Sequence, residues 1–193
     1  MPHTYTTTTD NTYYLKVRRT KKGTPSYYLT RKKDEDCLDI MPAGYEIFEK
    51  YDTGQAFIRK VKKSHIEGRE VEIIKQELRK NKSLHDFKLD ICGDEIRIYV
   101  KTRGTNTEVS EILRGLGREA PEAVWSKFIR YEEQMRIMLT QHKNKREFTF
   151  LRYCYRSSVD DWIEIEAGSD VAALAKNNLF HLGKESYYEL FGF

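Results

Sequence analysis

The segment from Phe87 to Lys101 most constrains the fold, because its pattern predicts a β-hairpin and also the register of its two strands. At its centre lies Gly93-Asp94, a dipeptide suited to a two-residue turn whose backbone needs positive φ. With that turn, apolar residues face each other in the pairs Ile91–Ile96, Leu89–Ile98 and Phe87–Val100. A shift of one residue would move all of these side chains to the opposite face, so the pattern favours one register. The same register sets Asp90 opposite Arg97 and Lys88 opposite Tyr99.

Alternation of apolar and polar residues predicts three further strand pairs. They cover residues 13–32, with a loop at 21–25; residues 45–62, with a turn at 52–54; and residues 148–156 with 162–166. A five-residue loop in the third pair would set Arg152 opposite Glu166 and Cys154 opposite Glu164.

Apolar residues at spacings of three and four predict four helices, which begin near Ser64, Thr105, Pro121 and Ser169. At the first, Ser64 and Glu67 have the form of a capping box, in which each side chain binds the main-chain N–H of the other. That helix is expected to end at Asn81. The helix from Pro121 is expected to run about 20 residues, to the basic cluster at His142. Its apolar stripe consists of Val124, Phe128, Tyr131, Met135 and Met138.

These elements predict an α+β protein in which antiparallel β-hairpins alternate with helices, as one compact body or two small lobes joined near residue 103. We expect a disordered tail over residues 1–12 and a hairpin-rich α+β region over residues 13–101. Residues 102–193 are expected to form a helical region with one strand pair and C-terminal helices.

The composition excludes several classes of protein. No apolar run reaches the 18 or more residues of a membrane-spanning helix, so we expect no membrane contact. The first twelve residues show neither a secretory signal nor a transit peptide. The cysteines Cys37, Cys92 and Cys154 are spaced more than fifty residues apart, unlike a disulfide framework or a zinc site. A cytoplasmic location is the expectation.

Charge is distributed unevenly along the chain. The net charge is +4, but residues 1–33 carry +7 and residues 157–193 carry −5. In the first hairpin, cations and tyrosines share one predicted strand face beside a basic loop. Cations bind phosphates and flat rings stack on bases, so this face is a candidate site for single-stranded nucleic acid. The candidate residues are Tyr14, Lys16, Arg18, Lys21, Lys22, Tyr28 and Lys32. The alternative is a solvated sheet face, because tyrosine is a common strand residue and edge cations deter aggregation.

Two acidic groups offer a different chemistry, since carboxylates on neighbouring strands can hold a divalent cation for phosphodiester hydrolysis. The first consists of Asp90, Asp94 and Glu95; the second consists of Asp160, Asp161, Glu164 and Glu166. Cross-strand pairing and turn chemistry account for both groups without a metal.

We therefore expect a non-catalytic intracellular binding protein of a larger assembly, with a protein partner and with nucleic acid at the basic hairpin. No nucleophile motif, phosphate-binding loop or dinucleotide fingerprint occurs, so no cofactor or metal is expected. The alternatives are a metal-dependent phosphodiester hydrolase of nuclease type and a protein-only adaptor. The adaptor would expose the aromatic C-terminus or the methionines near residue 135.

Overall fold

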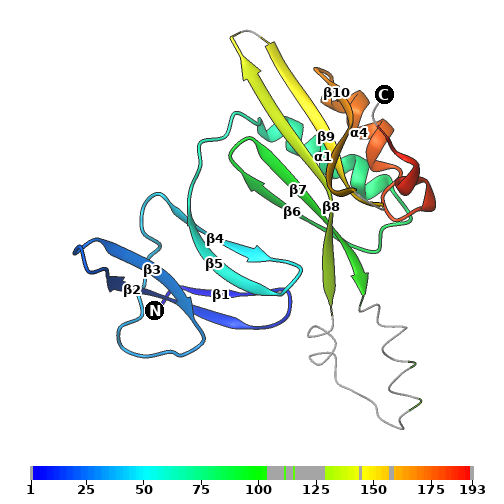
Figure 1. The fold of residues 1–193 in the computed structure, drawn as a ribbon. Coiled ribbons are helices and arrows are strands. Elements are labelled where there is room, and N and C mark those ends of the chain that lie inside the picture. Colours follow the sequence, from blue (N-terminus) through cyan, green and yellow to red (C-terminus); the bar gives the residue numbers. More distant parts are fainter. Residues whose placement is uncertain are drawn as a thin grey trace. The chain divides into compact units, whose positions relative to one another are not determined.

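The computed structural model describes residues 2–103, 111, 115, 129–143, 145–156 and 159–191 (Figure 1). The chain divides into two units, residues 1–61 with 102–130 and residues 62–101 with 131–193. Each unit is described by itself. Within the described part, no helix has the length and apolar character needed to cross a membrane.

The first unit contains two small antiparallel sheets. One has the order β1-β2-β3, and the other pairs β4 with β5. Their strands are β1 (Thr4–Thr6), β2 (Thr12–Arg19), β3 (Pro25–Thr30), β4 (Tyr45–Lys50) and β5 (Gln55–Lys60). The hairpins predicted within residues 13–32 and 45–62 are therefore confirmed.

The expected disorder of residues 1–12 is wrong, because Thr4–Thr6 pairs with β2. A buried carboxylate helps to hold this segment in place. Glu49 of β4 is 3% exposed and accepts hydrogen bonds from the Tyr5 hydroxyl at 3.2 Å and from the N–H and hydroxyl of Thr8. Because a buried carboxylate is costly unless it is hydrogen-bonded, these contacts order the N-terminal segment.

The second unit is a five-stranded antiparallel sheet in the order β10-β9-β8-β7-β6, with two helices and a 3₁₀ turn (Figure 1). Its elements are α1 (Gly68–Lys80), β6 (Phe87–Cys92), β7 (Glu95–Arg103), β8 (Arg130–His142), β9 (Lys145–Arg156), β10 (Val159–Gly168), α4 (Val171–Leu179) and η2 (Glu185–Glu189). Fully buried residues of α1 and α4, such as Ile74 and Leu179, join the sheet residues Ile98, Ile137 and Phe150 in one core. The helices thus cover one face of the sheet.

The hairpin of β6 and β7 has the predicted register throughout. Ile91 pairs with Ile96, and Asp90 pairs with Arg97. Gly93 has a φ of 63°, which confirms the positive φ expected of the turn. The alternation of apolar residues was thus sufficient to determine the pairing.

The helix predicted from Pro121 to His142 is wrong over residues 130–142, which form strand β8. Met135, Ile137 and Leu139 are buried at a spacing of two, whereas Met138 is 45% exposed. The chain is therefore α+β with strands predominating, and its hairpins do not alternate with helices as expected. The start of the helix predicted from Thr105 and the start of the Pro121 helix lie outside the described residues.

Smaller corrections concern helix caps and one register. The capping box of α1 joins Glu67 to Glu70, while Ser64 accepts a hydrogen bond from the N–H of Ile66. Asp170, not Ser169, caps α4. The third predicted strand pair exists, but β10 begins at Val159, so the connection is shorter than the expected five residues. Arg152 consequently pairs with Ile163 and Cys154 with Asp161, instead of the predicted glutamates.

Candidate nucleic-acid interface

The β2–β3 hairpin brings the predicted cations and rings onto one face. Its register pairs Tyr14 with Thr30, Lys16 with Tyr28 and Arg18 with Ser26. Directly opposed residues project to the same side of a sheet, so Tyr14, Lys16, Arg18 and Tyr28 lie on one face as predicted.

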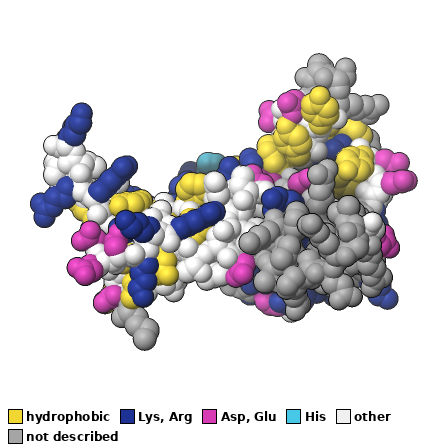
Figure 2. Space-filling model, turned by 90° about the horizontal axis from the view of Figure 1, so that it is seen from below, with side chains coloured by type: hydrophobic (Ala, Val, Ile, Leu, Met, Phe, Trp, Pro, Cys, Tyr) yellow, Lys and Arg dark blue, Asp and Glu magenta, His cyan; other side chains and the backbone are white. Residues whose placement is uncertain are grey.

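The end of this hairpin is strongly basic. Gly23, with a φ of 79°, allows the tight turn in which the Thr20 N–H donates to the Thr24 carbonyl at 2.9 Å. Four exposed cations flank this turn, and we call them the basic tip: Arg18, Arg19, Lys21 and Lys22. Figure 2 shows Lys and Arg side chains gathered over the first unit, with exposed hydrophobic side chains between them.

Lys16 differs from the residues of the basic tip because it has a carboxylate partner. Its ammonium group binds Asp34, and only 12% of its side chain is exposed. The hydrogen bond between the two groups raises the pKa of Lys16 and lowers the pKa of Asp34. The charge of Lys16 is thus balanced within the protein.

The other predicted residues have different degrees of access. Tyr28 is 38% exposed, and the Arg18 guanidinium lies 5.8 Å from its ring centroid. Tyr14 is half-buried. Lys32 is exposed beyond the end of β3, but it lies close in sequence to the acidic run 34–36. The basic tip and Tyr28 are therefore the most accessible part of the predicted set.

A cavity of about 440 Å³ lies between β3 and β5, and we call it the aromatic cavity. Its lining residues are Tyr13, Tyr27, Tyr28, Leu29, Gln55, Ala56, Phe57 and Ile58. Sequence reasoning did not find this cavity, because it depends on how two separate hairpins pack. It also missed Arg31, whose guanidinium lies 5.6 Å from the ring centroid of Tyr13.

The first acidic group is occupied by neighbouring donors. Asp94 accepts a hydrogen bond from the main-chain N–H of His65 at 2.6 Å and lies 2.9 Å from Nδ1 of the same residue. These bonds lower the pKa of the Asp94 carboxyl. Glu95 binds Arg97 at 3.0 Å and Arg136 at 3.6 Å. Asp94 and Glu95 are thus paired with His65, Arg97 and Arg136, which are partners other than the cross-strand pair and the turn contacts that were expected.

In the second acidic group, Asp160 accepts a hydrogen bond from the Tyr153 hydroxyl, and Glu166 accepts one from the Asn178 amide at 2.5 Å. A register shift between Glu164 and Glu166 interrupts the strand between these two carboxylates. Across the described ranges, no set of three or more His, Cys, Asp or Glu side chains is placed to hold a metal ion.

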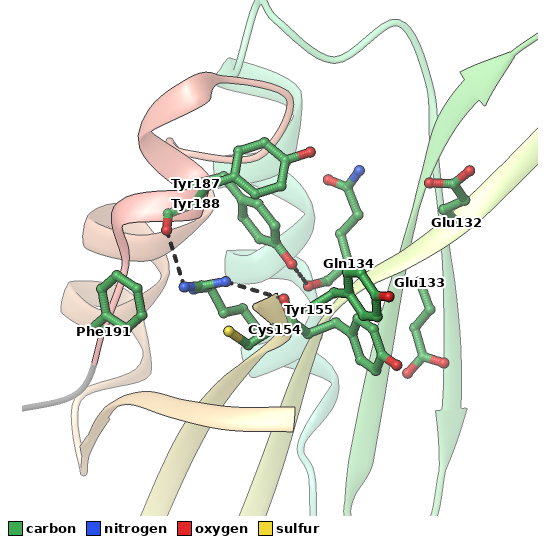
Figure 3. A pocket seen from close by; sticks show the side chains of 10 residues that line it. Glu132, Glu133, Gln134, Cys154, Tyr155, Tyr187, Tyr188 and Phe191 are labelled. Atoms are coloured by element: carbon green, nitrogen blue, oxygen red, sulfur yellow. Dashed lines mark hydrogen bonds between the residues drawn. The ribbon is translucent and has the colours of Figure 1, made fainter. Parts of the chain in front are cut away.

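The second unit has a separate pocket of about 250 Å³ between β8, β9 and the C-terminal segment. Figure 3 shows Tyr187, Tyr188 and Phe191 on one side and Glu132 and Glu133 on the other.

Arg152, which is 2% exposed, forms one wall of this pocket. Its guanidinium donates to the main-chain oxygens of Tyr153, Tyr188 and Leu190. This arginine therefore fastens the C-terminal segment to β9.

No family model matches the chain, and no curated protein or solved structure matches it either.

Proposed function

We propose that this protein is a non-catalytic binding protein that holds single-stranded nucleic acid with the basic tip and works with a protein partner. The observation that carries the proposal is the gathering of four exposed cations at one hairpin end, next to an exposed tyrosine. Among the described residues no carboxylate is paired with these four cations, so they can neutralise phosphates directly, and this electrostatic contribution dominates non-specific affinity for nucleic acid.

The site favours single strands without strong sequence preference. The basic tip lies at a β-turn, and flexible arginine and lysine side chains on such a turn contact phosphates of any sequence. A ring beside these cations can stack on an unpaired base, whereas bases in a duplex are already stacked.

The protein partner is assigned to the second unit, where aromatic residues surround the pocket beside η2. Tyr155 is 81% exposed and Tyr188 is 69% exposed. Exposed aromatic residues close together are typical of protein interfaces. A partner that presents a cationic side chain fits best, because the Glu132 carboxylate lies at the same pocket and cations bind the faces of aromatic rings.

Binding of a fluorescently labelled thymidine oligonucleotide at ~50 mM salt, where phosphate contacts are strong, tests the nucleic-acid part. The variant Arg18→Ala/Lys21→Ala/Lys22→Ala should bind much more weakly than the wild type. A matched control is Lys63→Ala/Lys82→Ala/Lys176→Ala, which removes three exposed positive charges from the second unit and should bind like the wild type. Equal loss in both variants would show that only net charge matters, and wild-type protein that binds no oligonucleotide would refute the proposal.

A further inference from the structure

We infer that the aromatic cavity is a nucleobase site, which receives an unpaired base while the flanking cations hold the phosphates of the same strand. This inference rests on the proposed function and adds the group that is recognised. Its volume of about 440 Å³ lies within the range typical of small-ligand sites and exceeds that of a single base.

The chemistry of the lining suits a flat, uncharged group. None of the eight lining residues carries a charge at neutral pH, and four of them supply aromatic rings. Phe57 and Tyr28 are 40% and 38% exposed, so part of each ring is accessible to a ligand, while Phe57 also stacks on Phe48 and Arg18 lies over Tyr28. Gln55 is exposed at the same site and offers an amide donor and an amide acceptor, which match the edge of a base.

The positions of the arginines point to a ligand that is anionic outside the cavity. Two cavity tyrosines each carry a guanidinium over the ring: Arg18 lies 5.8 Å from Tyr28, and Arg31 lies 5.6 Å from Tyr13. Arg18 also belongs to the basic tip, so the tip and the cavity meet at Tyr28. A nucleotide within a strand has an uncharged base with a phosphate on either side. Such a ligand matches an uncharged cavity flanked by arginines better than an apolar peptide does.

The test compares three probes of equal length: a thymidine oligonucleotide, the same strand with abasic sites throughout, and a thymidine–adenine duplex. We expect the thymidine strand to bind at least ~10-fold more tightly than the abasic strand, as the loss of one stacked base predicts. The duplex should also bind more weakly. Free thymidine monophosphate should compete poorly, because it reaches few of the cations.

Variants separate the ring from the charge. Tyr28→Ala should weaken binding of the thymidine strand by ~10-fold, leave the abasic strand unaffected and leave the salt dependence unchanged. Tyr28→Phe keeps the ring and should restore affinity. Phe180→Ala removes an exposed aromatic ring from the second unit, outside both proposed binding surfaces, and should have no effect.

Equal affinity for thymidine and abasic strands, or full affinity in Tyr28→Ala, would overturn the nucleobase site while the basic tip remained a phosphate site. Absence of binding to every oligonucleotide would overturn the proposed function together with this inference. If free thymidine monophosphate competed as well as the strand at the same concentration of nucleotides, the ligand would be a free nucleotide and the inference of a strand would be wrong. Competition by a proline-rich peptide at the same concentration would identify the cavity as a peptide groove instead.

Discussion

Asn81 allows a quantitative test of how the second unit is held together. This residue ends α1, is 5% exposed and makes its hydrogen bonds to a segment far along the chain. Its amide nitrogen donates to the carbonyls of Leu179 and Leu182, each at 2.9 Å, and its carbonyl accepts from the N–H of Ser83 at 3.0 Å. One side chain thus joins the ends of α1 and α4.

Asn81→Ala removes three well-formed hydrogen bonds from a buried site. At about 1 kcal/mol for each bond, the free energy of unfolding should fall by about 3 kcal/mol. With a slope of about 2 kcal/mol per molar urea, the midpoint should fall by about 1.5 M. Asn81→Asp should be at least as harmful, because it keeps the acceptor for Ser83 but places a carboxylate oxygen against two carbonyl oxygens.

The measurement is urea unfolding followed by circular dichroism at the helix band. Asn177→Ala is the matched control, because Asn177 lies exposed on α4 with a single 3.4 Å bond to Glu166. The control should stay within about 0.5 kcal/mol of the wild type. A loss in Asn81→Ala no larger than that of the control would refute the account of α1 and α4 as helices joined through this amide.

Three further results are expected. Hydrogen bonds from His65 lower the pKa of Asp94 in the folded protein. As pH falls, the Asp94 carboxyl is therefore protonated in the unfolded chain before it is protonated in the folded protein. Stability supplied by Asp94 is therefore complete above pH ~4 and is lost below it, so acid unfolding should be steeper in the wild type than in Asp94→Asn. Purified protein should cleave neither DNA nor RNA with added magnesium or manganese beyond an Asp94→Ala/Glu95→Ala control, and cleavage abolished by those changes would favour the hydrolase. Arg152→Met should release the C-terminal segment, seen as faster chymotrypsin cleavage at Tyr188; unchanged cleavage would contradict the anchoring role of Arg152.

The hairpin of β6 and β7 could be predicted from sequence because its information is local. A turn dipeptide lies between two arms of matching polarity, and no other register buries the same residues. Strand β8 could not be predicted in this way. Tyr131, Met135 and Met138 are spaced by four and three, as on a helix, whereas Met135, Ile137 and Leu139 are spaced by two. The second spacing prevails because β9 supplies Phe150 opposite Ile137 and Phe148 opposite Leu139.

The candidate site was predictable to a similar extent. The shared face of Arg18 and Tyr28 follows from alternation within one hairpin. The pairing of Lys16 with Asp34 depends on the path of the chain after β3, which no local pattern specifies. The aromatic cavity likewise requires the packing of β5 against β3, so Phe57 carried no signal that distinguished it from other strand residues.

The dependence of affinity on salt tests the central claim most directly, because it counts phosphates neutralised by the protein. Each contact with a single strand contributes about 0.7 to the slope of log affinity against log salt concentration. Replacing Arg18, Lys21 and Lys22 by alanine should lower that slope by about 2, since all three are exposed and project from the basic tip. Lys16→Ala should leave the slope nearly unchanged, because Asp34 already balances its charge. Two results would contradict the assignment of the basic tip as the phosphate-binding site. One is a slope that the triple substitution leaves unchanged. The other is a Lys16→Ala slope that falls as much as the slope falls for each residue replaced in the triple variant.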